Sequence, residues 1–207
     1  MKRGGRPRHR RNHPHSKIFS DLLDDARGVM LDTVYHEFGT GYVPRWHRDI
    51  IDLHGAYLAS ARHTLLIAER DGVVVATGAL DSRGPVHPPN PQALAERYPS
   101  GTTAQLRRIY VRPEHRRRGL ARQLVRRLAD FAAQDGGYEA VYLHTDPSVP
   151  GAEPFWRSLG EVVCDERQET GQSVVHFEIA VTMANGVGRR AGTSRADARA
   201  GVPATTP

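Results

Sequence analysis

Three consecutive arginines stand immediately before a glycine at the start of a helix-like segment. The run reads Arg116, Arg117, Arg118, Gly119, Leu120 and Ala121. The first backbone N–H groups of a helix have no acceptor within it, and the helix dipole adds partial positive charge there. Because glycine and alanine leave this backbone open, an anion can approach it closely. The run is therefore predicted to cradle a diphosphate; the alternative is an arginine-rich helix start that is only solvated.

Two other kinds of phosphate-binding loop are not found in the sequence. There is no G-x-x-x-x-G-K-[ST] run, which excludes a P-loop. There is also no G-x-G-x-x-G after a predicted strand, so a dinucleotide-binding fold is unsupported. The predicted anion site therefore rests on the arginine-rich turn and the helix that follows it.

The spacing of apolar residues predicts the elements that must position this turn. Helical spacing predicts helices at residues 21–38, 44–59, 92–98, 119–134 and 152–159. β-Branched and apolar runs predict strands at 63–69, 73–80, 104–111, 138–145, 162–165 and 174–181. Their order indicates an α/β fold with a mixed central sheet of about six strands and flanking helices.

Two local signals refine the strands. Asp71-Gly72, between the first two strands, is typical of a β-hairpin turn. In the third strand Leu106 and Ile109 are three residues apart, where strict alternation would put them on opposite faces. One extra residue between them, a β-bulge, would return both to the same face.

The arginine-rich turn and a second motif downstream resemble the GNAT superfamily of N-acetyltransferases. Arg116-x-x-Gly119-x-Ala121 matches that family's pyrophosphate motif, [Q/R]-x-x-G-x-[G/A]. The segment Tyr110-Val111-Arg112-Pro113 is also similar to the family, as is Ala152-x-x-Phe155-Trp156-x-x-x-Gly160. The resemblance covers roughly residues 18–182 and implies a GNAT-like acyl-CoA N-acyltransferase fold.

The resemblance implies where a donor would bind and what reaction would follow. Acetyl-CoA is expected in a V-shaped cleft between the strands that end at Val111 and near Thr145, with its pantetheine amides on the backbone of Ile109, Tyr110 and Val111. Its pyrophosphate would lie on residues 116–121. The implied function is transfer of an acetyl or short acyl group to a primary amine by direct attack in a ternary complex. The alternative is a non-catalytic CoA-binding or nucleic-acid-associated module.

The residue that protonates the leaving thiolate does not carry over from the family. The family uses a tyrosine of the second motif, where this chain has Trp156, and an indole N–H is too weak an acid. Trp156 packs either on the pantetheine arm or in the core. His144, with an ordinary pKa near 6.5, and Tyr142 on the same strand face are the replacement candidates. A hydrogen-bonded structural role for the histidine stays open.

The general base is equally open. The amine must lose a proton before it attacks, because an ammonium with a pKa near 10.4 has no lone pair. The family often places a carboxylate on a central strand, where this chain has Gln105 and Arg107. Glu69 and Asp81, at strand ends, are alternatives. A path through water without a dedicated base is another.

Acceptor recognition is expected from the first two helices and the long loop before the third strand. Residues 35–42 are rich in polar aromatic side chains near a turn, which suits a binding rim or an ordinary helix end. The net charge is +6, of which residues 1–17 contribute +7 and residues 184–207 contribute +3. The remainder carries about −4, which would weakly steer a cationic acceptor, a small-molecule or peptide amine.

The ends of the chain differ in composition from the rest. Residues 1–17 are predicted to be a disordered basic leader, 18–183 the acetyltransferase domain, and 184–207 a disordered tail. The leader could make weak phosphate contacts with nucleic acid. Cys164 is the single cysteine, which fits a cytoplasmic protein, and no membrane span or metal site is expected.

Overall fold

The structure is a computed structural model that describes residues 14–135, 137–169 and 171–180. Most of the predicted leader and all of the predicted tail lie outside these residues. The domain boundaries stay a prediction.

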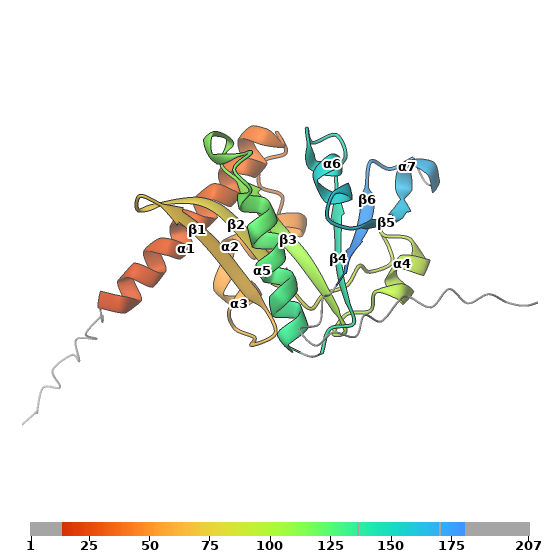
Figure 1. The fold of residues 1–207 in the computed structure, drawn as a ribbon, viewed down its shortest axis with the longest axis horizontal. Coiled ribbons are helices and arrows are strands. Elements are labelled where there is room, and N and C mark those ends of the chain that lie inside the picture. Colours follow the sequence, from red (N-terminus) through yellow and green to blue (C-terminus); the bar gives the residue numbers. More distant parts are fainter. Residues whose placement is uncertain (1–13, 136, 170, 181–207) are drawn as a thin grey trace, which may run out of the picture.

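Six strands form one mixed sheet, as predicted. Their order is β1-β2-β3-β4-β6-β5, with β3 and β4 parallel and the other neighbours antiparallel (Figure 1). The strands are β1 Thr64–Arg70, β2 Val73–Asp81, β3 Thr103–Val111, β4 Ala140–Thr145, β5 Glu161–Asp165 and β6 Val175–Ile179. The single parallel pair lies at the centre, so the chain must cross the sheet between β3 and β4.

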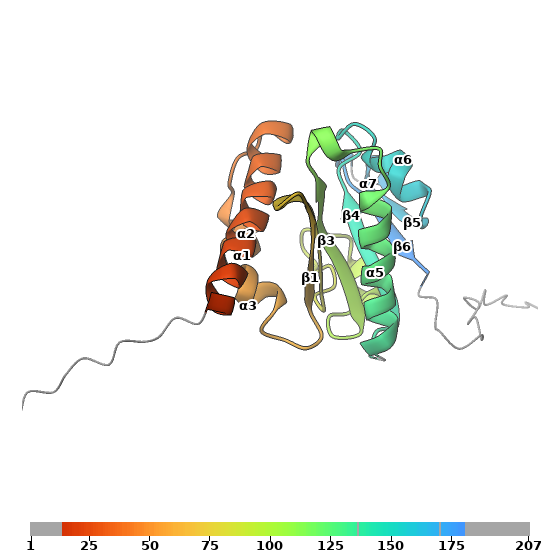
Figure 2. The same cartoon turned by 60° about the vertical axis from the view of Figure 1, so that its left-hand side comes forward.

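Helices cover both faces of the sheet, as Figure 2 shows with α1 to α3 on one side and α5 on the other. The helices are α1 Pro14–Asp32, α2 Pro44–Ile51, α3 Leu53–Tyr57, α4 Gln92–Arg97, α5 Leu120–Asp135, α6 Ala152–Arg157 and α7 Glu166–Glu169. A π-helical turn, η1 Thr33–Glu37, extends α1, and a 3-10 turn, η2 Pro113–His115, follows β3. Within the described residues no helix has both the length and the apolar character needed to cross a bilayer.

Two apolar cores fix these layers. The inner stripe of α5, with Val125, Leu128 and Ala132 fully or almost fully buried, packs against β2 and β3 in a cluster that also includes side chains of β4 and β6. On the opposite face, Ala26 and Met30 of α1 pack with α2 and α3 over β2. Burying side chains the size of valine, leucine or methionine contributes about 1.5–3 kcal/mol each, and this packing holds β3 between two helical layers.

The predicted helix at 44–59 is interrupted. Asp52 has φ −115° and ψ 69°, and its carboxylate accepts a 2.8 Å hydrogen bond from the backbone N–H of Gly55. This side chain therefore ends α2 and caps α3, so two short helices replace one long helix. Apolar spacing continues across the break, which is why periodicity alone did not reveal it. The short α7 was not predicted either.

The predicted hairpin and bulge are both confirmed. Asp71 and Gly72 have φ values of 52° and 77°, as a two-residue hairpin turn requires. Opposite β2, the register shifts between Thr77, paired with Tyr110, and Ala79, paired with Arg107. The shift places Leu106 and Ile109 in the same core cluster.

Candidate active site

The central parallel strands separate after a short paired stretch. Their pairing runs from Thr103–Ala140 to Gln105–Tyr142. Beyond it, β3 stays with β2 as far as Val111 while β4 stays with β6 as far as Thr145, and Figure 1 shows the two strands diverging. The β4-facing edge of Ile109–Val111 is therefore not used in the described sheet, and such an edge can pair with an extended ligand.

The arginine-rich turn closes the wide end of this opening. Residues 116–119 connect η2 to α5, residues 120 and 121 begin α5, and Gly119 has φ 79°. A Cβ at Gly119 would meet only Gln123 Nε2, at 3.9 Å. Glycine is therefore required by the backbone conformation and not by crowding, and the backbone there is open to a ligand.

A pocket of about 230 Å³ lies against this turn. Its walls are Val111, His115, Arg116, Arg117, Gly119, Leu120, Ala121, Arg122 and Phe155. The structure thus brings most of the predicted pyrophosphate residues together with Phe155 of the second motif. His115 lines this pocket, and its Nδ1 atom is buried without a hydrogen-bond partner in the described part of the chain.

The guanidinium group of Arg116 forms contacts with other residues of the protein. Its Nε donates a 2.9 Å hydrogen bond to the carbonyl oxygen of Val111, and its Nη2 forms an ion pair with Glu37 of η1. The side chain thus ties the end of β3 to the turn and to the helical layer. Arg117 and Arg118 are exposed, and neither guanidinium group forms a hydrogen bond or ion pair with another of the described residues.

A chain of hydrogen bonds fixes the tautomer of His144. Arg107 Nη2 donates to Gln105 Oε1 at 2.6 Å, and Gln105 Nε2 lies 3.4 Å from His144 Nδ1. A guanidinium can only donate, so the amide oxygen must face Arg107 and the amide NH₂ must face the imidazole. Nδ1 of His144 therefore accepts, and the neutral ring carries its proton on Nε2.

The same surroundings keep His144 neutral. The residue keeps contact with solvent, but neighbouring protein atoms crowd its ring. Desolvation by these atoms, with the electrostatic influence of Arg107, His176 and Arg108, lowers the pKa of His144 to about 4. Near pH 7 its Nε2–H can donate a hydrogen bond, whereas protonation is disfavoured.

Tyr142 is directed into a buried polar network and not into the opening. Its hydroxyl lies 2.6 Å from His176 Nδ1, and His176 Nε2 lies 2.6 Å from Glu166 Oε1. All three side chains are almost completely buried. Burial, with the negative charge of Glu166, raises the pKa of Tyr142 above its ordinary value. His144 and Tyr142 share a strand face, as expected, with ring centroids 6.4 Å apart.

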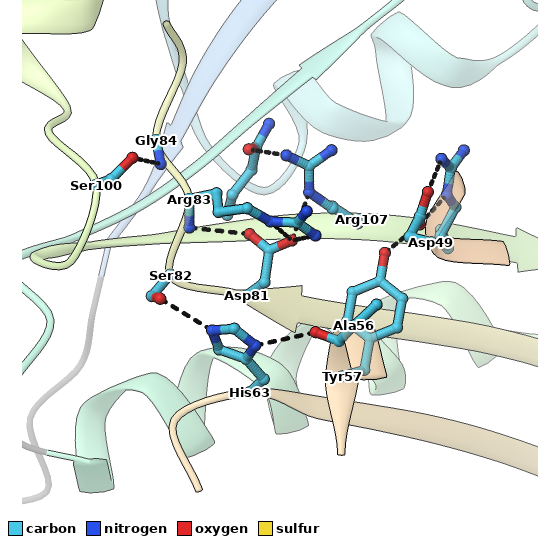
Figure 3. Close-up of polar contacts among 12 residues, drawn as sticks. Asp49, Ala56, Tyr57, His63, Asp81, Ser82, Arg83, Gly84, Ser100 and Arg107 are labelled. Carbon is cyan, nitrogen blue, oxygen red and sulfur yellow. Dashed lines mark hydrogen bonds and ion pairs between the residues drawn. The ribbon is translucent and has the colours of Figure 1, made fainter. Parts of the chain in front are cut away.

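The carboxylates considered as general bases are occupied or distant. Asp81, fully buried, accepts from the backbone N–H and Nε of Arg83 at 3.0 and 2.9 Å and faces Arg107 Nε at 2.8 Å (Figure 3). Its carboxylate is therefore already held by two arginines. Glu69 is exposed at the hairpin end of β1, and its strand lies at the outer edge of the sheet.

Trp156 belongs to the core. It is 8% exposed and packs with Val141, Leu143 and Phe177 in the cluster under α5. Its ring meets Phe155 edge to face, with centroids 4.8 Å apart. Phe155, and not Trp156, is the side chain of this motif that borders the pocket.

The segment at residues 35–42 lies against β3. Phe38 packs edge to face on Tyr110, with ring centroids 5.7 Å apart, and Tyr42 lies beside His47 of α2. Tyr35 is 54% exposed. The carboxylates between this segment and His144 do not form an acidic surface, because Asp49 and Asp81 both face arginines.

Sequence reasoning missed two groups here. The first is Asp49 with Arg108, an ion pair between α2 and the bulge of β3; the off-register apolar pattern marked the bulge but not its anchor. The second is Glu166 with His176, for which no spacing signal existed because the two lie on different elements. No cluster of three or more metal-ligating side chains occurs among the residues described.

Comparison with known proteins agrees with this architecture. The profile described as "Acetyltransferase (GNAT) family" matches residues 31–160. N-acetyltransferase 8 of Rattus norvegicus is 36% identical over 129 residues, 61% of this chain and 49% of that protein. N-acetyltransferase 8 of Homo sapiens is 34% identical over 126 residues, 60% of this chain and 47% of that protein. The chain spans about half the length of the curated relatives it matches.

Solved structures share the fold at low sequence identity. A GNAT-family acetyltransferase from Staphylococcus aureus superposes with a TM-score of 0.59 at 13% identity, covering 77% of this chain and 92% of that one. An N-acetyltransferase from Thermoplasma acidophilum, in complex with coenzyme A, gives 0.54 at 14% identity and the same coverages. The family profile extends over more than half of the chain, and the chain therefore belongs to the acetyltransferase (GNAT) family.

Proposed function

We propose that this chain transfers an acetyl or other short acyl group from acyl-CoA to a primary amine by direct attack in a ternary complex. One observation carries the proposal: the opening between β3 and β4 ends at the arginine-rich turn that begins α5. A free strand edge can pair with the extended arm that carries the thioester, and a helix N-terminus can bind the diphosphate. The coenzyme A bound to the Thermoplasma acidophilum protein of the same fold supports it.

The donor is assigned to residues that the fold brings together. The pantetheine arm lies along the backbone of Ile109, Tyr110 and Val111. The pyrophosphate lies on the N–H groups of residues 119–121, with Arg117 and Arg118 beside it, and Arg116 holds the turn in place through Val111 and Glu37. The thioester is then directed toward His144 on the neighbouring strand.

His144 contributes a hydrogen bond and not a base. The amine nitrogen attacks the thioester carbonyl carbon, the C–S bond breaks, and the sulfur leaves with the bonding electron pair. Nε2–H of the neutral imidazole donates to the developing negative charge on oxygen or sulfur. A group with a pKa of about 4 is a poor acceptor for the amine proton, which therefore leaves through water. Tyr142 contributes by holding His176 behind His144.

The acceptor is a small-molecule or peptide amine. It approaches over residues 35–42 and α2, because this segment packs on Tyr110 beside the donor strand. The buried carboxylates of Asp49 and Asp81 are paired with arginines. They therefore do not supply the negative charge that was expected to attract a cationic acceptor.

Calorimetry with acetyl-CoA, followed by thiol release with a panel of amines, tests the proposal. Saturable binding and amine-dependent thiol release are expected, both greatly reduced in Gly119→Glu. Absence of binding at millimolar acetyl-CoA would refute the donor assignment. Binding without thiol release across the panel would favour a non-catalytic CoA-binding protein. A fragment of residues 18–183 should retain the parent affinity, since every assigned donor contact lies inside it.

A further inference from the structure

Arg108 holds an unusual backbone conformation at the centre of β3. Its φ is 54°, in the left-handed region that side chains with a Cβ disfavour. It occupies the bulge, where β2 shifts register from Thr77 to Ala79. Its carbonyl oxygen accepts a 3.0 Å hydrogen bond from Thr77 Oγ1. Something must offset the cost of this conformation.

The side chain of Arg108 supplies that offset by binding helix α2. Its Nε and Nη2 lie 2.8 and 2.7 Å from the two carboxylate oxygens of Asp49, a two-pronged contact. Both side chains are about nine-tenths buried. Burial by itself would raise the pKa of Asp49, but the hydrogen bonds and charge of Arg108 outweigh it and lower that pKa.

Further bonds gather α2 and α3 around the pair. Arg108 also donates to the carbonyl oxygen of Trp46 and, at 3.1 Å, to the hydroxyl of Tyr110. The hydroxyl of Tyr57 in α3 donates to Asp49, as Figure 3 shows. These bonds thus hold the bulge from the face of the sheet that α2 and α3 cover. One edge of the bulged strand faces β4.

We infer that the Asp49–Arg108 ion pair is a positioning device that sets the β3 bulge, and through it the backbone edge of Ile109–Val111 that receives the donor. The register of β3 against β2 shifts between Arg107 and Tyr110, and the pairing of β3 with β4 ends at Gln105, just before it. A relaxed bulge would change the direction of residues 109–111. The role at the donor edge rests on the function proposed above.

Substitutions at Arg108 separate the backbone effect from the loss of charge. Arg108→Ala removes the ion pair with Asp49, while residue 108 must still adopt the disfavoured positive φ. The fraction of the protein in the conformation that binds the donor therefore falls, and acetyl-CoA should bind at least about tenfold more weakly. Glycine also removes the ion pair but adopts a positive φ freely, so its loss should stay within about threefold. Asp49→Ala should resemble Arg108→Ala, with the effect in the donor KM more than in kcat.

Asp32→Asn is the matched control. Asp32 pairs with Arg112 at 2.8 Å, also between the helical layer and the sheet, but at an exposed position just after β3 and outside the bulge. Its donor affinity should equal the parent's. Should any alanine variant fail to fold, Asp49→Asn keeps the side-chain shape and replaces it in the comparison.

Hydrogen–deuterium exchange without ligand completes the test. Peptides that span residues 106–112 should exchange faster in Arg108→Ala and Asp49→Ala, and at the parent rate in Asp32→Asn. This readout needs no donor, so it decides the inference even if the parent fails to bind acetyl-CoA. Equal losses in the alanine and glycine variants, or a lowered Tm with unchanged exchange and affinity, would overturn it.

Discussion

The side-chain amide of Gln105 lies between Arg107 Nη2 and His144 Nδ1, at 2.6 and 3.4 Å. Since the guanidinium has no acceptor atom, the amide is oriented and passes that orientation to the imidazole. The outcome is a neutral histidine whose proton is on Nε2. Gln105 and Arg107 occupy the strand positions where the family often has a catalytic carboxylate. Here they make Nε2–H of His144 a hydrogen-bond donor.

This arrangement predicts the pH dependence of His144. Its pKa is lowered to about 4, so the ring stays neutral as the pH passes through 6.5, and kcat/KM should show no step there from this group. Gln105→Glu places a carboxylate beside Nδ1, which favours the charged imidazole and should raise the pKa of His144 substantially. NMR of the ring nitrogens against pH measures both the tautomer and the titration.

Gln134→Glu controls for the added charge, because Gln134 is exposed on α5. It should leave the titration of His144 at the parent value. A parent His144 that titrates near 6.5, or carries its proton on Nδ1, would contradict the hydrogen-bond chain.

Gly119→Glu should weaken acetyl-CoA binding by at least about a hundredfold. The new side chain would place bulk and negative charge against the N–H groups that hold the pyrophosphate, and each charge-assisted hydrogen bond lost is worth roughly 1.5–3 kcal/mol. Calorimetry on the folded variant measures the loss. Arg116→Ala should cost less, since Arg117, Arg118 and the backbone remain.

Gly72→Glu separates this effect from backbone strain. Gly72 has φ 77°, close to the 79° of Gly119, and nothing lies near its Cβ position. It is at the tip of the β1–β2 hairpin, so the same substitution should lower Tm without changing donor affinity. Normal affinity in Gly119→Glu would show that the donor lies elsewhere.

The positions of the strands along the chain and the glycine-containing turn before α5 could be read from the sequence because both depend on local patterns. In the third strand the alternation of apolar residues fails only at Leu106 and Ile109, which are three positions apart. This departure was enough to predict the bulge. The turn at Asp71-Gly72 and the glycine at 119 follow from local backbone preferences, because glycine adopts a positive φ freely and aspartate does so more often than most residues.

Contacts between distant residues could not be read in the same way. Asp49 and Arg108 are 59 positions apart, and Tyr142 meets His176 across 34; no spacing rule links them. The break between α2 and α3 depends on one hydrogen bond, from the backbone N–H of Gly55 to the side chain of Asp52. The helical spacing of apolar residues continues across it and gives no sign of the break. The lowered pKa of His144 also required the three-dimensional positions of Arg107, His176 and Arg108.

Trp156 is expected to matter for stability and not for donor binding. Because it is 8% exposed inside the core, Trp156→Ala should destabilise the protein by about 3–5 kcal/mol, measured by chemical denaturation. Trp46→Ala is the control; that side chain is 53% exposed, and the loss should be within about 0.5 kcal/mol. If Trp156→Phe stays folded yet binds acetyl-CoA several-fold more weakly, the indole contacts the pantetheine arm.

Tyr142→Phe tests whether the buried network acts in catalysis or only in positioning. The substitution removes the hydroxyl from His176 Nδ1 and leaves that buried atom unpaired, at a cost of about 1–3 kcal/mol in unfolding free energy. Because the hydroxyl does not reach the opening, kcat should change by less than about threefold while the donor KM stays the same. His144→Ala, assayed alongside, should lower kcat by a much larger factor with little loss of stability, since His144 is open to solvent. A Tyr142→Phe enzyme with parent stability and a kcat reduced more than tenfold would instead make the tyrosine hydroxyl the proton donor to the leaving sulfur.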